Sequence, residues 1–236
     1  LGMSQEDPTI VVKPLSSISY LGGAGIVALH GHALGANMNF ISVVGDDPSA
    51  NFAKNELKNK VKSFLIKDSS RPTSLKERFR AKNKTLLRVS DLSDSFISTD
   101  IQNEIISHLK HISEKLDLII LSDFNYGVLP DSLIREISKI AKKYGIMVVA
   151  DSQSSSQTGD IGRFNDMHLI TPTEREARIS IRNNQIGLVK LAEELKLKSK
   201  CEYIFIKLGE EGLFLHVEDK KINNNFITDR LNALNP

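Results

Sequence analysis

Polar residues follow several of the apolar segments that the sequence predicts to be β-strands, and three of these strand ends carry aspartate. In an open parallel sheet, ligands bind beyond the carboxyl ends of the strands, so these side chains are expected to line one ligand site. Taken singly, each aspartate could equally cap a helix or stabilise a turn. The polar strand ends are Gly45-Asp46-Asp47, Ser122-Asp123, Asp151, Thr171-Pro172-Thr173 and Lys207-Leu208-Gly209.

A second candidate region, residues 75–90, is basic. Its sequence predicts two strands, LKERFRA and TLLRVS, around a turn at Lys82-Asn83-Lys84. The first strand alternates, which places Lys76, Arg78 and Arg80 on the side opposite its apolar residues. A ribbon with one basic face is not typical of a core element. Two interpretations remain open: a solvated surface, or a flap that places cations over an anionic substrate.

The elements that would position these residues alternate between apolar strands and helices of about 10 to 15 residues. Such alternation predicts an α/β fold with a mainly parallel sheet, and its irregular spacing favours an open three-layer α/β/α sandwich over a barrel of eight equal units. Helices are expected in residues 24–34, 48–60, 99–116 (with Thr99 and Gln102 as a capping box), 130–145, 174–178 and 188–197. Strands are expected in residues 9–13, 17–20, 40–44, 61–66, 118–121, 147–150, 168–171, 203–208 and 212–217.

The first helix follows a glycine-rich turn, in which Gly22, Gly23 and Gly25 let the backbone approach a ligand or another segment closely. Residues 23–28 fit G-x-G-x-x-A, and Asp46 follows about 20 residues later, which is the outline of a dinucleotide-binding fingerprint. Small-residue helix packing produces the same pattern, and residues 17–21 make a poor buried first strand. The sequence holds no G-x-x-x-x-G-K-[ST] loop, no zinc-ligand spacing and no G-x-S-x-G motif.

The bulk composition of the 236 residues fits one domain, or one domain with a small appendage. Apolar residues make up 40% of the sequence, which is enough for a core. The net charge of +2 favours neither nucleic acid nor an acidic partner. The single Cys201 cannot form an internal disulfide and fits the reducing cytoplasm, and the absence of an apolar run of about 18 residues argues against a membrane span.

Six short motifs follow one another along the chain. They are Tyr20-Leu21-Gly22-Gly23-Ala24, Val44-Gly45-Asp46-Asp47, Arg71-Pro72-Thr73 with Lys76, Arg78, Asn83 and Arg88, Leu121-Ser122-Asp123-Phe124, Ile170-Thr171-Pro172-Thr173 through Glu176, and Leu208-Gly209-Glu210-Glu211-Gly212. Together they resemble the ribokinase-like sugar kinases, also called the PfkB carbohydrate kinase family. The nearest branch is the kinase domain of the bifunctional heptose-phosphate kinase/adenylyltransferase, and the resemblance covers nearly the whole chain.

The resemblance implies a single ribokinase-like domain over residues 1–236, with lid strands at about 9–20 and 74–90 that often pair between the subunits of a homodimer. It also implies transfer of the γ-phosphoryl group of ATP to a sugar or sugar-phosphate hydroxyl with Mg²⁺, by positioning and charge neutralisation. The implied site residues fall into three groups: for the sugar or its phosphate, Gly22, Gly23, Asp123, Lys76, Arg78 and Arg88; for the nucleotide, Lys207, Gly209 and Gly212; and, for Mg²⁺ through water or phosphate, Glu176.

The sequence departs from the family pattern at four positions, and these departures leave the acceptor open. The family's asparagines are replaced by Ile26 and Thr173, and its lysines by Tyr126 and Gln153. The family's G-A-G-D segment, with the catalytic base, is expected after Pro236, and its first strand before the start of the chain. The chain is therefore expected to be incomplete at both ends and inactive by itself. Two alternatives stay open: a kinase-derived module that binds sugar or nucleotide without catalysis, and a dinucleotide-binding oxidoreductase based on residues 23–28.

Overall fold

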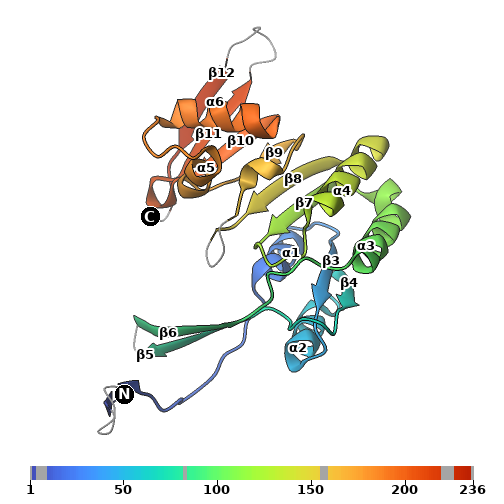
Figure 1. The fold of residues 1–236 in the computed structure, drawn as a ribbon, viewed down its shortest axis with the longest axis vertical. Coiled ribbons are helices and arrows are strands. Elements are labelled where there is room, and N and C mark those ends of the chain that lie inside the picture. Colours follow the sequence, from blue (N-terminus) through green and yellow to red (C-terminus); the bar gives the residue numbers. More distant parts are fainter. Residues whose placement is uncertain (1, 4–9, 82–83, 155–158, 219–225, 235–236) are drawn as a thin grey trace. The chain divides into compact units, whose positions relative to one another are not determined.

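The computed structural model describes residues 2–3, 10–81, 84–154, 159–218 and 226–234 (Figure 1). The chain divides into two compact units, one over residues 1–93 and the other over residues 94–236. The predicted α/β class with a central, mostly parallel sheet is confirmed. Within the described ranges, every helix is too short or too polar to cross a bilayer.

The first unit contains a βαβ element and an antiparallel hairpin. Strands β3 (Asn39–Val44) and β4 (Lys62–Lys67) are parallel, and α2 (Pro48–Leu57) joins them. Helix α1 (Gly23–Ala33) precedes β3, and its Ala28 packs with Leu57 and Val61 in a small core. Strand β5 (Leu75–Ala81) pairs antiparallel with β6 (Lys84–Asp91), which confirms the predicted hairpin.

The N-terminal strands are shorter than predicted. Strand β1 (Gly2–Met3) pairs antiparallel with β2 (Ile10–Val11), whereas the predicted strand over residues 17–20 does not form. Ile18 and Tyr20 are 71% and 79% exposed, so that short apolar alternation lacks the neighbouring strand it would need. No strand leads from residues 12–22 into α1, so the described residues lack the strand–turn–helix context of a dinucleotide fingerprint.

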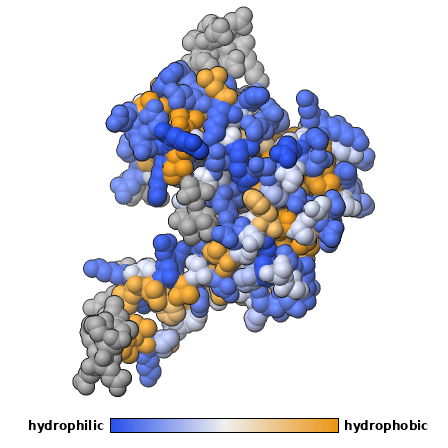
Figure 2. Space-filling view, viewed as in Figure 1, coloured by the Kyte–Doolittle hydropathy of each residue, from blue (hydrophilic) through white to orange (hydrophobic). Residues whose placement is uncertain are grey.

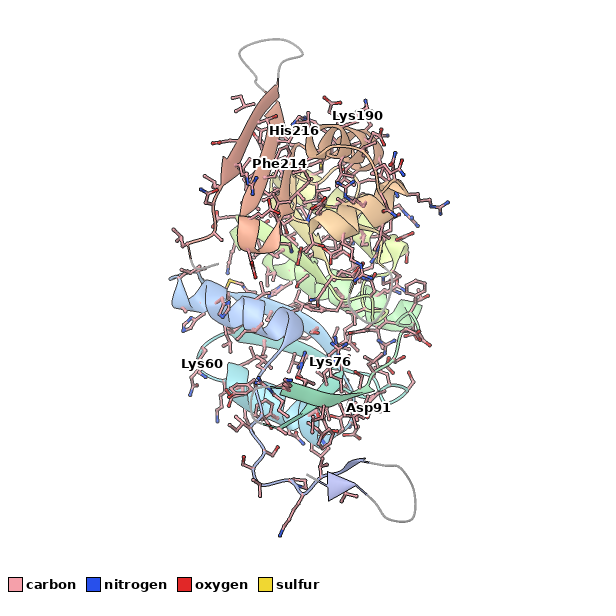
Figure 3. The ribbon with its side chains drawn as sticks, turned by 90° about the vertical axis from the view of Figure 1, so that its left-hand side faces the viewer. Lys60, Lys76, Asp91, Lys190, Phe214 and His216 are labelled. Carbon is pink, nitrogen blue, oxygen red and sulfur yellow. The ribbon has the colours of Figure 1, made fainter. Side chains whose placement is uncertain are left out.

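The second unit is built on a six-stranded sheet in the order β12-β11-β10-β9-β8-β7. Strands β7 (Leu118–Asp123), β8 (Met147–Ser152), β9 (Leu169–Ile170) and β10 (Tyr203–Lys207) are parallel to their neighbours in this group. Strand β11 (Leu213–Glu218) is antiparallel to β10. Strand β12 (Phe226–Leu231) adds a further antiparallel strand, which has no counterpart among the predicted ones. Figure 3 shows Phe214 and His216 two residues apart on β11, and both are buried.

Four helices accompany this sheet: α3 (Thr99–Ile112), α4 (Asp131–Tyr144), α5 (Glu174–Ile181) and α6 (Leu188–Ser199) (Figure 1). In α4, Leu133, Ile134, Ile137 and Ile140 recur at helical spacing, and all four are buried. Helix α3 begins at Thr99, as predicted, and ends at Ile112, before the predicted Leu116. Its cap differs from the prediction, because the hydroxyl of Ser98, and not that of Thr99, accepts the N–H of Ile101. Short 3₁₀ turns lie at Ser113–Lys115, Ile161–Arg163 and Gly209–Glu211.

The register of the sheet buries one face more than the other. Leu121, Ala150, Ile170 and Ile204 are aligned across β7 to β10, and each is at most 4% exposed. On the other face, Leu118 and Met147 are a register pair that stays 42% and 50% exposed. Side chains alternate between faces along a strand, so the polar residues at the carboxyl ends are divided between these two faces as well.

Candidate functional site

The carboxyl ends of β7 and β8 carry two of the predicted aspartates. The register pairs Asp123 with Ser152 and Asp151 with Ser122, so the two carboxylates belong to opposite faces of the sheet. The prediction that polar residues gather at the carboxyl ends holds for this unit. They form two hydrogen-bonded groups, one around Asp123 and one around Asp151.

The Asp123 carboxylate is 4% exposed and lies within a dense set of donors. Its Oδ1 accepts the backbone N–H of Asn125 at 2.9 Å. Its Oδ2 accepts the hydroxyl of Ser152 at 3.1 Å and Nη2 of Arg163 at 2.8 Å. A buried polar group is costly without hydrogen-bond partners, and these three donors supply them.

The Asp151 group combines a carboxylate, a hydroxyl and an ammonium. Its Oδ1 accepts Nζ of Lys207 at 2.7 Å and the hydroxyl of Thr171 at 3.0 Å. The side chains of Lys207 and Asp151 are 42% and 36% exposed. Lys207, which we predicted to lie beside a nucleotide, is therefore anchored at the end of β10 while its side chain remains open to solvent.

Glu176, the predicted Mg²⁺-linked residue, is 5% exposed, and both of its oxygens accept backbone hydrogen bonds. Oε2 accepts the N–H of Thr173 at 2.8 Å and completes a capping box at the start of α5. Oε1 accepts the N–H of Ser154 at 2.9 Å. Glu176 thus joins the segment that follows β8 to the helix that follows β9, along the same carboxyl edge as Asp151 and Lys207.

The two glycines predicted to lie beside the nucleotide differ in their surroundings. Gly209 has φ +62°, and a Cβ there would meet no atom within 4 Å, so the space above it is open. Gly212 has φ +97°, and a Cβ there would collide with the backbone oxygen of Leu231. Gly212 is therefore required by the turn into β11, whether or not it also contacts a ligand.

At the end of β3, the two neighbouring aspartates have different partners. Asp46 pairs with Lys67 at 2.7 Å, and both side chains are more than half exposed, so this ion pair contributes little to stability. Asp47 caps α2: its Oδ1 accepts the N–H of Ala50 at 2.8 Å, and its Oδ2 accepts the N–H of Thr73 at 2.7 Å. The chain therefore ties the start of the hairpin to the end of β3.

Gly45 makes this connection possible. A Cβ at residue 45 would lie 2.6 Å from the backbone oxygen of Arg71 and 2.8 Å from the nitrogen of Thr73. The N–H of Gly45 in turn donates to Oγ1 of Thr73 at 2.8 Å.

We expect Asp47→Ala to reduce the free energy of unfolding by about 1–2 kcal/mol at pH 7, because α2 loses its cap and Thr73 its acceptor. Partial burial acts to raise the pKa of Asp47, but the hydrogen bonds from Thr73 and Ala50 outweigh it and hold the pKa below 3.8. The contribution is therefore full above about pH 3.8 and is lost as the pH falls through the lower folded value.

Urea denaturation of Asp47→Ala and of the neighbouring Asp46→Ala, at pH 7 and below pH 3.8, measures this effect. Asp46→Ala should stay within about 0.5 kcal/mol of the parent protein. Equal losses in the two variants, or a loss at Asp47 that does not shrink at low pH, would contradict the prediction.

The turn before α1 holds the two glycines predicted to contact the sugar. Gly22 is the N-cap, and a Cβ there would meet no atom within 4 Å. Gly23 has φ +55°, a conformation that favours glycine. The backbone here is open to a ligand at the helix N-terminus, as the prediction requires.

The β5–β6 hairpin gathers the predicted phosphate-binding residues on one face. Arg78 and Arg88 are a direct cross-strand pair, and Lys76 lies two residues before Arg78, on the same side (Lys76 is labelled in Figure 3). Both arginines are exposed, and no carboxylate of the described residues forms an ion pair with either. Like charges directly opposite one another destabilise a sheet. The Arg78–Arg88 pair therefore does not stabilise the hairpin within the described part of the chain.

The other face of the hairpin is mainly apolar, although it also carries Glu77 opposite Val89 and Asp91 opposite Leu75. Leu75, Leu87 and Val89 are 40%, 56% and 43% exposed. Figure 2 shows apolar side chains gathered around this hairpin and the N-terminal segment. The hairpin is thus an exposed ribbon with one basic face and one mainly apolar face, and it is not buried inside the fold.

The four residues that depart from the family pattern have identifiable surroundings. Tyr126 is 9% exposed and stacks on Phe124 with ring centroids 6.4 Å apart. Thr173 caps α5 through its hydroxyl. Gln153 uses its backbone, whose N–H donates to the Asp123 carbonyl and whose carbonyl accepts from Asn125. Ile26 lies in the first turn of α1 and is partly buried.

Sequence reasoning missed Arg163, which makes three polar contacts at the carboxyl edge. It follows a polar loop without periodicity, and only the aspartates it contacts could have pointed to it. Among the described residues, no group of three or more His, Cys, Asp or Glu side chains could hold a metal ion.

Two curated relatives illustrate the sequence similarity. The bifunctional protein HldE of Aliarcobacter butzleri is 34% identical over 227 residues, and that of Campylobacter fetus is 32% identical over 224 residues. Both alignments cover 93% of this chain but only 46% and 48% of the relatives. The chain therefore spans about half the length of the curated relatives it matches.

Solved structures show the same fold. Phosphofructokinase-2 from Escherichia coli, in its tetrameric inhibited form, aligns with a TM-score of 0.66 at 15% identity over 88% of this chain and 66% of that one. Ribokinase from Giardia lamblia aligns with a TM-score of 0.67 at 14% identity over 89% and 64%. The model of the pfkB family of carbohydrate kinases matches residues 7–228. Since that match spans most of the sequence, the chain belongs to the pfkB carbohydrate kinase family.

Proposed function

We propose that the chain is the core of an ATP-dependent kinase whose acceptor is a hydroxyl group of a phosphorylated sugar. Membership of the carbohydrate kinase family supports the reaction class. We propose a sugar phosphate and not a free sugar because of the cross-strand pair of Arg78 and Arg88. Two adjacent guanidinium groups without a carboxylate partner suit a phosphate dianion.

In this proposal, each described group has one task. Asp123 accepts a hydrogen bond from a sugar hydroxyl, and the backbone at Gly22 and Gly23 lies against the sugar. Lys76, Arg78 and Arg88 bind the sugar's own phosphate. No general base is assigned within the described residues.

The nucleotide is assigned to the ends of β9 and β10. Lys207 neutralises phosphate charge, and the open space above Gly209 accepts the nucleotide, with Gly212 next to it. Bound ATP–Mg²⁺ supplies the γ-phosphoryl group, and catalysis relies on positioning and charge neutralisation. ATP and sugar phosphates are cytoplasmic metabolites, so we also assign the protein to the cytoplasm.

A panel of hexose and heptose monophosphates, each beside its unphosphorylated sugar, tests the function. When the full product of the gene is assayed with ATP–Mg²⁺, ADP release is expected for at least one sugar phosphate, with kcat/KM at least about tenfold above that for its unphosphorylated partner. Mass spectrometry should find a bisphosphorylated product. Equal kcat/KM for the two forms would contradict the sugar-phosphate assignment, and binding without turnover on any panel member would favour a non-catalytic homologue.

We further propose that the apolar face of the hairpin pairs with the same hairpin of a second copy. An isolated two-stranded ribbon is marginally stable in water, and covering Leu87 and Val89 would stabilise it. Leu87→Arg is expected to convert a dimer to a monomer in light scattering, whereas Thr85→Arg, on the basic face beside Arg80, should leave the dimer intact. A monomeric parent protein, or a dimer that survives Leu87→Arg, would end this proposal.

A further inference from the structure

The guanidinium group of Arg163 connects three segments at the carboxyl edge of the sheet. Nη2 donates to Asp123 at 2.8 Å, and Nη1 donates to the carbonyl of Leu129 at 2.9 Å and to Asp131 at 2.8 Å. The Asp131 carboxylate is 64% exposed, whereas that of Asp123 is 4% exposed. Of the two carboxylates that Arg163 contacts, one therefore lies in the interior and the other at the surface.

The hydrogen bonds of Asp123 leave little freedom to its carboxylate. A carboxylate offers about four acceptor positions. Two are used on Oδ2, by Arg163 and Ser152, and one on Oδ1, by the N–H of Asn125. The remaining capacity lies on Oδ1, so Asp123 can accept from a single additional hydroxyl. Without the guanidinium group, the carboxylate could rotate and lose this distinction between its two oxygens.

Arg163 is itself held firmly. Its guanidinium carbon lies 4.6 Å from the ring centroid of Phe164, which is fully buried. The preceding turn is fixed by Asp160, whose Oδ1 accepts the N–H of Gly162 at 2.9 Å and the hydroxyl of Ser180 at 2.6 Å. Nζ of Lys198 donates to Oδ2 of Asp160 at 2.7 Å.

The charge state of Asp160 suits this anchoring role. Burial acts to raise the pKa of Asp160, but the hydrogen bonds from Lys198 and Ser180 outweigh it and lower the pKa below 3.8. The carboxylate is therefore ionised at neutral pH. A Cβ at Gly162 would lie 2.6 Å from Oγ of Ser180 and 2.7 Å from Cδ of Lys198, so the turn packs closely on α5 and α6.

We propose that Arg163 is a positioning residue of the sugar site, which orients Asp123 so that only Oδ1 is available to one acceptor-sugar hydroxyl. This inference rests on the proposed function, because it assigns Asp123 to the sugar. Arg163 does not contact the sugar itself in this scheme. It acts through Asp123. Asp160 and Lys198 fix the turn that carries Arg163, and Arg163 in turn fixes the orientation of the Asp123 carboxylate.

The test compares Arg163→Met and Arg163→Lys with the control Asp131→Asn, which neutralises only the exposed carboxylate partner of Arg163. With the sugar phosphate that the panel ranks first, Arg163→Met is expected to raise KM at least about tenfold, while KM for ATP stays within about twofold. Arg163→Lys keeps the charge but cannot bridge Asp123 and Leu129, so its KM should lie between those of the parent and the methionine variant. Asp131→Asn should match the parent.

Crystal structures of the variants give a readout that needs no substrate. In Arg163→Met, the Asp123 carboxylate should turn away from Ser152 or Asn125, and in Asp131→Asn it should not. An unmoved Asp123, or equal KM values for Arg163→Met and Asp131→Asn, would overturn the inference. If Arg163→Met does not fold, an Arg163→Lys variant with the parent's KM and Asp123 orientation would overturn it as well. Failure of every panel member with the parent protein would instead reject the proposed function.

Discussion

Replacing both Arg78 and Arg88 with methionine is expected to raise KM for the sugar phosphate by about 100-fold or more. Each charge-assisted hydrogen bond to phosphate is worth about 1.5–3 kcal/mol, and about 1.4 kcal/mol corresponds to a factor of ten. The two side chains share one exposed face as a cross-strand pair, so they would act on the same phosphate. KM for ATP should stay within about twofold, because the nucleotide is assigned to other residues.

Two controls separate phosphate recognition from general effects of charge or folding. Lys84→Met removes one positive charge from the same hairpin near its turn and should leave KM within about threefold, whereas Arg88→Met alone should raise it about tenfold or more. The unphosphorylated sugar should show the same weak activity with the parent and the double variant. A similar loss for both sugars, or equal effects of Lys84→Met and Arg88→Met, would contradict the assignment.

The removal of the Arg78–Arg88 repulsion gives a second, independent expectation. Like charges directly opposite in an antiparallel pair destabilise it by up to about 1 kcal/mol. The double variant should therefore be at least as resistant to urea as the parent, even though its affinity for the sugar phosphate falls. A loss of affinity together with a gain of stability is the behaviour of a binding site, and a structural salt-bridge network would show the opposite change in stability.

The elements with long periodic patterns could be predicted from the sequence. In α4, four apolar residues at helical spacing and a closing glycine determine the helix and its buried face locally. The short segments could not be predicted in this way. Residues 17–20 alternate like a strand but pair with no strand in the described part of the chain, and β12 pairs with β11 only because the chain returns to it. Strand formation depends on a neighbour that local composition does not specify.

In the second unit, the gathering of polar strand ends was predictable, because a parallel sheet places its carboxyl ends on one edge. The prediction did not hold for Asp46 and Asp47, which follow a strand of a separate two-stranded sheet. The partners of these residues were not. Asp47 is a helix cap that also holds Thr73, and Asp123 is paired with Arg163, which is 40 residues away in sequence. The division of Asp123 and Asp151 between two faces follows from the exact register of β7 and β8, which a strand boundary uncertain by one residue cannot give.

Glu176→Gln is expected to reduce the free energy of unfolding by about 2–4 kcal/mol. The side chain is buried, and each oxygen accepts one backbone N–H, from Thr173 and from Ser154. A glutamine must turn its NH₂ group toward one of these donors, which leaves a buried N–H without an acceptor, at about 1–3 kcal/mol, and also weakens the cap of α5. Urea denaturation measures the change.

Glu174→Gln is the matched control, because Glu174 lies in the same first turn of α5 and is 42% exposed in an ion pair with Arg178. It should lose no more than about 1 kcal/mol, as exposed pairs do. Glu176→Gln should also raise KM for ATP–Mg²⁺ while KM for the sugar phosphate stays within about twofold. Equal free energies of unfolding for the two variants would show that the backbone hydrogen bonds of Glu176 do not contribute to stability. A stability loss without a change in KM for ATP–Mg²⁺ would restrict Glu176 to capping α5 and remove it from the nucleotide site.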